Sequence, residues 1–158
     1  MIIKKFLDLA KKDLFPLNRS LTGMGTLTTL NIIKKNFNSF KIKHIKSGEK
    51  VYDWRIPKQW EITSAYVIDK FGRKIIDFSK NNLHLVGYSK PIKKKIILKK
   101  LLSHLHSIPK QPSAIPYITS YYKKYWGFCI NHKQKRKILN TYKLNDTIPV
   151  TISWRDGS

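Results

Sequence analysis

The chain has 158 residues and a formal net charge of +23, from 32 lysines and arginines against 9 aspartates and glutamates. A hydrophobic fraction of 41% is enough to build a core, which argues against a wholly disordered chain, and a single cysteine excludes an internal disulfide framework. The length suits one domain, or one domain plus part of another.

Two amphipathic helices are expected at the start of the chain. Apolar residues recur with helical spacing from Ile2 to Leu14, and Pro16 ends the pattern. Charges interrupt this segment every few residues, so we expect a helix of the folded protein and not a cleavable signal. After the turn TGMG, a second helix is indicated by apolar residues at three- and four-residue intervals: Leu27, Leu30, Ile33 and Phe37.

Short strands and turns are predicted in the middle of the chain. FKIKHIKSG (residues 40–48) alternates apolar and basic residues, which predicts a half-buried strand. AYVIDKFGRKIIDF (65–78) has two alternating runs around Phe71 and Gly72, which predicts a hairpin. NNLHLVGYSKPI (81–92) contains another short strand.

The last third of the chain mixes a helix, a charge run and a strand. KQKRKIL (133–139) is expected to be a solvated charge run, and TIPVTISW (147–154) a last strand with nothing after it to pack against. This organisation suggests the opening of a larger α/β protein with a β-rich piece inserted. IILKKLLSHLHSI (96–108) is predicted to be a helix that ends before Pro109 and Pro112, with one apolar face formed by Ile97, Leu101, Leu102 and Leu105.

The positive charge has two explanations. The electrostatic field of a chain with a net charge of +23 attracts polyanions and anionic membrane surfaces. However, nearly all of the excess is lysine, scattered among many isoleucines and asparagines, as expected from the codon usage of an AT-rich genome. We expect a cytoplasmic protein, because a single cysteine fits a reducing compartment and no apolar run approaches the roughly 20 residues of a membrane span.

Nucleotide and metal sites are poorly supported by residue spacing. Gly23 and Gly25 lack the third glycine and the lysine-hydroxyl ending of a phosphate loop, so they are better explained as a helix-entry turn. His104 and His106 are two residues apart, which puts them on different faces of a helix. His84 is better explained as a half-buried polar residue of a strand. The chain alone is therefore expected to hold no zinc.

Two further groups have a structural explanation that outweighs a catalytic one. Cys129 and His132 could form a nucleophile and base, but a separation of three residues does not ensure contact, and a lone cysteine between apolar residues is usually buried. The carboxylates are few and scattered. Their one suggestive grouping, Asp53 beside Trp54 and Glu61 beside Trp60, is expected to make structural hydrogen bonds.

The segment AIPYITSYYKKYWGFCINH (114–132) has the densest aromatic content of the chain. Its rings could stack on bases beside Lys123 and Lys124, which would make a nucleic-acid platform. The same spacing also suits an amphipathic turn whose rings face inward while the lysines face water. The rings in question are Tyr117, Tyr121, Tyr122, Tyr125 and Trp126.

Several strings, taken in order, resemble the N-terminal part of a bacterial aminopeptidase-like family that carries domain-of-unknown-function labels and is often associated with polysaccharide biosynthesis. They are LFPLNRSLTGMGTLTTL, SGEKVYDWRIPKQWEI, AYVIDKFGRKIIDFSKNNLHLVGYSKPI and LLSHLHSIPKQPSAIPYITSYYKKYWGFCINH. The resemblance runs from about Leu14 to Ser158. Two positions depart from the family, where Leu27 replaces an arginine and Gln59 replaces a glutamate.

The resemblance implies an α+β fold: N-terminal helices of an α/β zinc-exopeptidase-like core plus a mostly-β inserted domain. Residues 1–50 would supply the helices and first strand of the core, 51–145 the insert, and 146–158 a strand returning to the core. In the family, zinc binds to residues that come later, so zinc is expected in the full-length family protein and no catalytic or metal-binding residue is expected on this chain.

The resemblance also implies a role for the aromatic segment and for partners. The insert is expected to shape or cover a substrate cleft, with Tyr121, Tyr122 and Trp126 lining it. A downstream chain carrying the zinc ligands is the expected partner, and association into a homo-oligomer is possible. No membrane partner is expected. The alternative is a basic module that binds nucleic acid or another polyanion.

Overall fold

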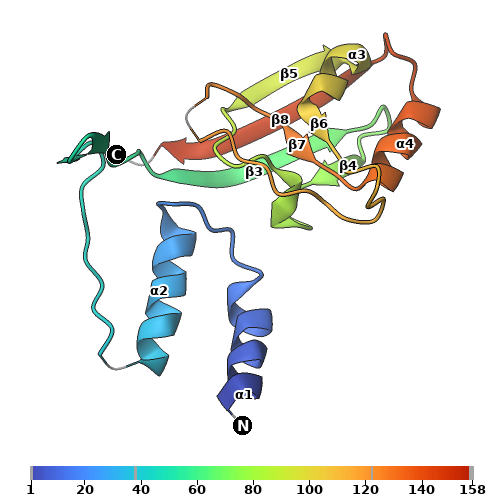
Figure 1. Cartoon of the computed structure of the whole chain (residues 1–158). Helices are drawn as coiled ribbons and strands as arrows, with labels where there is room; N and C mark the ends of the chain where they lie inside the picture. The colour runs from blue at the N-terminus through green and yellow to red at the C-terminus, as the bar shows by residue number, and fades with distance from the viewer. Residues whose placement is uncertain (1, 38, 122, 157–158) are drawn as a thin grey trace. The chain divides into compact units, whose positions relative to one another are not determined.

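The computed structural model describes residues 2–37, 39–121 and 123–156. The chain has an α+β fold and forms two compact units, one of residues 1–61 with 155–158 and the other of residues 62–154. The first unit holds two helices and a small hairpin, and the second holds the main sheet (Figure 1).

Both predicted N-terminal helices are confirmed. Helix α1 (Ile2–Leu9) continues into the π-helical turn η1 (Ala10–Leu14), and α2 spans Met24–Asn36. Gly23 caps the start of α2 with φ of 111°, a left-handed conformation that favours glycine. A Cβ on Gly25 would overlap the backbone carbonyl of Asn18, so the second glycine lets the preceding loop approach the helix. The TGMG sequence is thus a helix-entry turn.

The strand predicted over residues 40–48 is wrong. Residues 40–46 are irregular, and Ile45 is exposed. An alternating pattern produces a strand only where a neighbouring backbone is available to pair with it, and the pairs that the structure describes include none with these residues. The nearest strands are the two-residue pieces β1 (Lys50–Val51) and β2 (Trp54–Arg55), which pair with each other.

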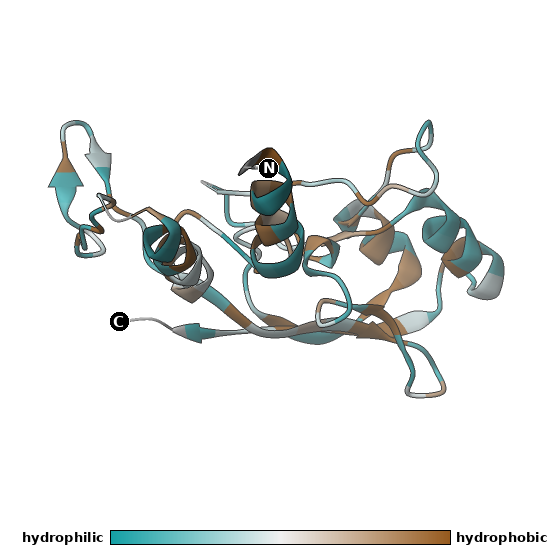
Figure 2. Ribbon diagram, turned by 90° about the horizontal axis from the view of Figure 1, so that it is seen from below, coloured by the Kyte–Doolittle hydropathy of each residue, from teal (hydrophilic) through white to brown (hydrophobic). Residues whose placement is uncertain are grey.

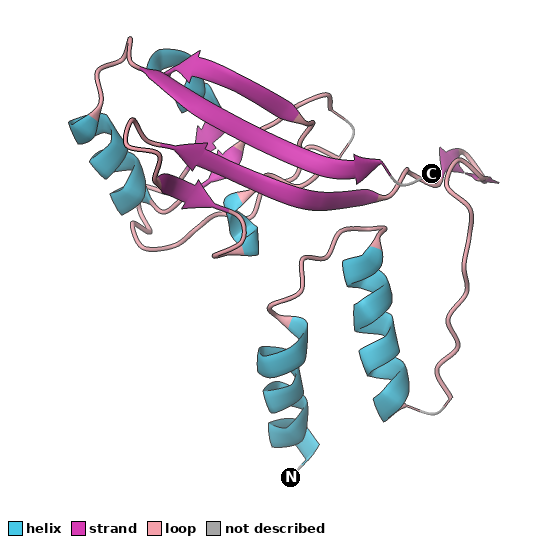
Figure 3. Cartoon of the chain, turned by 180° about the vertical axis from the view of Figure 1, so that it is seen from behind, coloured by secondary structure: helices cyan, strands magenta, loops and turns pink. Residues whose placement is uncertain are grey.

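The second unit is built on a four-stranded sheet in the order β4-β3-β8-β5 (Figure 3). Its strands are β3 (Trp60–Ile68), β4 (Lys74–Asp77), β5 (Ile92–Ile97) and β8 (Thr147–Asp156). The predicted hairpin over 65–78 is confirmed, since β3 and β4 pair antiparallel around the turn that contains Gly72. The predicted C-terminal strand is confirmed, and it lies between β3 and β5, which both precede it in the chain.

Alternation along the strands places the core on one face of this sheet. Ala65 and Val67 of β3 are buried, as are Ile148, Val150 and Ile152 of β8. Seen from below, the sheet lies nearly edge-on with the short helices of this unit on one side of it (Figure 2). The elements that complete the core are η2 (Asn82–His84), α3 (Leu98–Leu101), η3 (Leu102–His104), β6 (Leu105–His106), β7 (Phe128–Cys129) and α4 (His132–Thr141).

Two of the three predictions for these covering elements need correction. The helix predicted over 96–108 is confined to 98–104, because β5 takes up its first residues and Leu105 and His106 pair in parallel with Phe128 and Cys129. The charge run 133–139 exposes Lys133, Arg136 and Lys137, as predicted, and lies in helix α4, which begins at a capping box between Asn131 and Gln134. The short strand predicted within 81–92 is present only as two isolated bridges, at Leu85 and Gly87, ahead of β5.

Candidate functional site

The aromatic segment 114–132 is tied by backbone hydrogen bonds to the loop that contains Gly87. The amide of Gly87 donates to the carbonyl of Ile118 at 2.8 Å, and the amide of Ser120 donates back to the carbonyl of Gly87 at 2.9 Å. Further along, the amides of Val86 and Lys90 donate to the carbonyls of Gly127 and Tyr125. These bonds place the segment in a defined path across the covering layer of the second unit.

Gly127 is required where the segment enters β7. A Cβ at this position would lie 2.9 Å from the ring of Tyr125 and 3.0 Å from the carbonyl oxygen of His104. The amide of Gly127 also donates to Oγ of Ser89 at 3.2 Å. The close approach at this glycine brings the rings on either side of it next to His104.

A cluster of four rings forms there. His104 stacks on Trp126 with ring centroids 3.8 Å apart and planes 10° apart, and on Tyr125 at 5.2 Å. Nδ1 of His104 lies 2.7 Å from the carbonyl of Trp126, so it donates a proton to that oxygen. Nε2 of His106 lies 2.8 Å from the hydroxyl of Tyr125, which donates to the carbonyl of Ser103 at 3.1 Å.

These hydrogen bonds define the protonation of the cluster. The hydroxyl of Tyr125 donates to a carbonyl, so it accepts the proton of Nε2 of His106. Burial, followed by electrostatic effects of Lys135 and His104, lowers the pKa of His106. Burial also raises the pKa of the Tyr125 hydroxyl. Both groups are therefore held neutral, and the cluster is a packed, hydrogen-bonded unit.

Two of the predicted cleft residues have different aromatic neighbours. Tyr121 is half-buried and makes an edge contact with Tyr88 at 5.0 Å, while Trp126 is half-buried against His104. Tyr122 lies outside the described residues. Lys123 and Lys124 are exposed, so the two cations in the middle of the segment face water. Tyr117, at the start of the segment, is 74% exposed.

Cys129 and His132 do not form a catalytic pair. The Cys129 side chain is fully buried, and burial raises the pKa of its thiol to about 11. The polar contacts described for the two residues lead elsewhere: Nδ1 of His132 lies 3.0 Å from Oγ of Ser107, and Nδ1 of His84 donates to the carbonyl of Cys129. The prediction of a core cysteine is confirmed. His84 is more deeply buried than predicted and lies in a 3-10 turn.

Across the described residues, no group of three histidine, cysteine, aspartate or glutamate side chains could hold a metal ion. Asp53 is exposed and Glu61 is half-buried. None of the helices within the described ranges is both long and apolar enough to cross a membrane.

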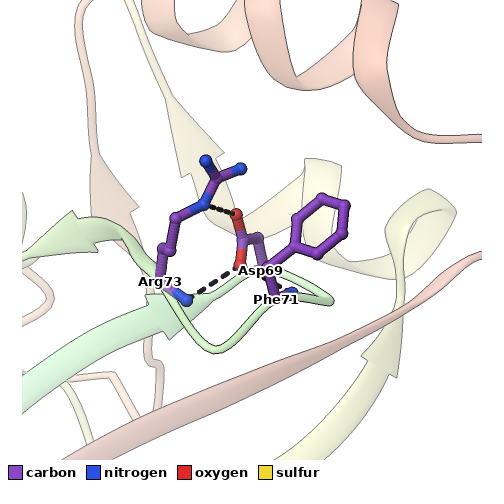
Figure 4. A network of polar contacts seen from close by, with 3 residues as sticks. All are labelled: Asp69, Phe71 and Arg73. Carbon is purple, nitrogen blue, oxygen red and sulfur yellow. Dashed lines mark hydrogen bonds and ion pairs between the residues drawn. The ribbon is translucent and has the colours of Figure 1, made fainter.

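Sequence reasoning missed the polar network of the β3–β4 turn (Figure 4). Asp69 is buried and accepts hydrogen bonds from the amides of Phe71 and Arg73 and, at 2.7 Å, from Nε of Arg73. Burial acts to raise the pKa of Asp69, but these three donors outweigh it and lower the pKa. An aspartate immediately before a glycine turn, followed by an arginine, is the signal that could have found it.

Comparison with known proteins agrees with this fold. Residues 59–149, more than half of the chain, match the family described as "Domain of unknown function (DUF2172)". A Clostridium acetobutylicum protein named "Putative polysaccharide biosynthesis protein with aminopeptidase-like domain" is 46% identical over 123 residues, which are 78% of this chain and 28% of that protein.

A solved structure covers nearly the whole chain. It is the 2.37 Å crystal structure of a "putative peptidase" from Clostridium acetobutylicum, with a TM-score of 0.81 and 39% identity over 99% of this chain and 39% of the solved chain. This chain therefore spans less than half the length of either relative and corresponds to a part of an aminopeptidase-like protein. It belongs to the DUF2172 family.

Proposed function

We propose that this chain is the N-terminal part of an aminopeptidase-like zinc hydrolase and does not hydrolyse a substrate by itself. The observation that carries the proposal is the match of 99% of the chain to part of a peptidase structure, at a TM-score of 0.81. The name of the curated relative, which includes an aminopeptidase-like domain, supports the same reaction class.

In this proposal the metal chemistry belongs to residues that follow in the longer family proteins. Hydrolysis by zinc needs three protein ligands and a general base to supply hydroxide at neutral pH. The described residues do not offer such a ligand set. Their own contribution is to bind and orient the peptide substrate.

We assign that contribution to the aromatic segment. Tyr121 and Trp126 are half-buried, and each is held by a neighbouring ring, so their positions are set before a substrate arrives. Rings held in this way contact apolar substrate side chains with little loss of conformational entropy. Tyr122 is the third proposed cleft residue.

The first test measures hydrolysis of aminoacyl nitroanilides by this chain with added zinc. We expect no turnover, and clear turnover would show that the chain carries its own catalytic centre. The second test uses the Clostridium acetobutylicum relative with residues 62–154 of this chain in place of their counterparts. Tyr121→Ala and Trp126→Ala should each raise KM about fivefold, the loss of one aromatic contact. Tyr117→Ala, an exposed ring of the same segment, is the matched control and should leave KM unchanged.

A second candidate function rests on the exposure of Lys123 and Lys124 and on the net charge of +23. A polyanion-binding module would bind single-stranded nucleic acid with an affinity that falls steeply as salt rises. Lys123→Ala and Lys124→Ala together should then weaken binding, while Tyr117→Ala should not. Undetectable or salt-insensitive binding would exclude this candidate.

A further inference from the structure

Three connections of the second unit meet at one end of the main sheet: the β3–β4 turn, the junction between β5 and α3, and the link between α4 and β8 (Figures 1 and 3). The amide of Lys99 donates to the carbonyl of Leu144 at 2.8 Å, which joins the second connection to the third. Burial raises the pKa of the Tyr142 hydroxyl, with smaller electrostatic effects from Asp69 and Arg73 at the first connection. We call residues 70–74, 97–100 and 142–146 the distal surface.

Each connection presents one large apolar side chain to solvent. Phe71 is 69% exposed, Leu144 is 50% exposed and Ile97 is 38% exposed. Isolated exposed apolar residues are common and need no explanation, but here each of three neighbouring connections at the same end of the sheet carries one. Each also has an exposed lysine within two positions along the chain: Lys70, Lys143 and Lys99.

The distal surface carries more cations than carboxylates, although Arg73 is paired with Asp69 and Lys74 with Asp77. The turn carries Lys70 and Arg73, whose cationic groups lie 5.1 Å and 5.0 Å from the centre of the Phe71 ring. Asp69 is buried beneath Arg73, and Oδ2 of Asp146 accepts the amide of Lys143. Lys70 and Lys143, the lysines next to Phe71 and Leu144, are exposed to solvent.

The distal surface lies away from the points where the chain enters and leaves this unit. The chain enters at Ile62 in β3 and leaves at Trp154 in β8, and β8 runs against both of its neighbours (Figure 3). At about 3.3 Å per strand residue, Ile68 is about 20 Å from Ile62. The surface is thus built by this unit alone, at the end of the sheet opposite its covalent connections.

Contrary to the expectation from the sequence that no membrane is a partner, we propose that the distal surface docks on an anionic lipid bilayer, with Phe71 and Leu144 entering the interface and the surrounding lysines contacting headgroup phosphates. Attachment of this kind combines buried apolar area with attraction to anionic lipids. Apolar side chains at the tips of separate connections can each enter the deformable apolar layer of a bilayer. A nucleic acid would make use of the charge but offers no apolar phase to Leu144 or Ile97.

The main experiment measures flotation of the full chain with two kinds of vesicle, phosphatidylcholine alone and phosphatidylcholine mixed with phosphatidylglycerol. We expect binding to the mixed vesicles only. The double variant Phe71→Ser, Leu144→Ser should bind them about tenfold more weakly, because it removes the inserted area while keeping every charge. Tyr117→Ser, which removes an equally exposed ring elsewhere, is the matched control and should bind like the wild type.

A depth measurement separates insertion from adsorption. Phe71→Cys and Tyr117→Cys, each in a Cys129→Ala background and labelled with an environment-sensitive fluorophore, are mixed with the anionic vesicles. We expect a blue shift of emission at position 71 and none at position 117. Shifts at both positions, or at neither, would overturn the proposal.

Two results of the flotation experiment would also overturn it. Equal binding by the double variant and the wild type would mean adsorption by charge alone. Tighter binding to single-stranded DNA than to the vesicles, unaffected by the double variant, would mean a polyanion-binding surface. If the double variant unfolds at a lower temperature than the wild type, the single variants Phe71→Ser and Leu144→Ser are measured in its place. Both side chains are exposed, so neither single substitution disturbs the core.

Discussion

The imidazole of His104 lies flat against the indole of Trp126 and donates a hydrogen bond to the backbone carbonyl of the same residue, at 2.7 Å. One histidine thus holds both the side chain and the main chain of a proposed cleft residue. The same ring also stacks on Tyr125, and its hydrogen bond to Trp126 connects η3 to the aromatic segment over a separation of 22 residues.

His104→Leu should lower the free energy of unfolding by about 2 kcal/mol, because it removes the stacking contact and leaves a carbonyl without its donor. Denaturant unfolding followed by tryptophan fluorescence measures the change. Tyr117→Leu, an exposed position in the same segment, should change stability by less than about 0.5 kcal/mol. Equal effects at the two positions would mean that the His104 contacts contribute nothing.

Asp69 should make the fold sensitive to acid. Its pKa is lowered in the folded chain, so its contribution is fully present above the pKa of an unfolded aspartate and is lost as pH falls through the lower, folded value. Asp69→Asn should therefore melt at a lower temperature than the wild type at neutral pH, and the difference should shrink below about pH 4. Asp53→Asn, at an exposed position, is the control, and thermal melts over a pH series provide the measurement.

Cys129 should resist alkylation in the folded protein. Burial raises the pKa of its thiol from 9.0 to about 11, with a smaller opposing effect from a backbone hydrogen bond of Ile118. The thiolate fraction at mildly alkaline pH is then about a hundredfold lower than for an ordinary cysteine, before access is considered. Iodoacetamide labelling followed by mass spectrometry should be slow in buffer and fast in denaturant. Rapid labelling of the folded chain would contradict the buried position.

Asn131→Ala should destabilise the second unit by about 1 kcal/mol, because it removes the side-chain acceptor of the capping box at the start of α4. The oxygen Oδ1 of Asn131 accepts the amide of Gln134 at 2.8 Å. Asn140→Ala, an exposed asparagine-to-alanine change within the same helix, is the matched control and should be neutral or slightly stabilising. Denaturant unfolding compares the two variants, and a larger loss at position 140 would refute the capping role.

Features that depend on neighbouring residues were accessible from the sequence. The apolar spacing from Ile2 to Leu14 produces a helix, and the alternation around Gly72 produces the β3–β4 hairpin. Helix α4 could have been predicted, because Asn131 and Gln134 have the spacing of a capping box. It was missed because the many charged residues between 133 and 137 were interpreted only as a charge run.

Features that depend on residues far apart in the chain could not be predicted from the sequence. Residues 40–48 alternate as a strand should, yet remain irregular, while the two-residue strands β6 and β7 form where Leu105 meets Phe128. The cluster of His104, His106, Tyr125 and Trp126 is likewise assembled by the parallel pairing of β6 and β7, which brings together residues about twenty positions apart. No local period encodes such a pairing.

The sequence by itself determined the family, through the order of its motifs, and the local conformation at glycine turns, caps and regular apolar repeats, because these depend on dihedral preferences and on residues within one or two turns. Only the tertiary structure decided that β8 lies inside the sheet, that Cys129 and His132 have separate partners, and that Phe71, Ile97 and Leu144 lie at one end of the same sheet. Each of these depends on backbone hydrogen bonds and burial between segments far apart in the chain, which form only when the whole unit folds.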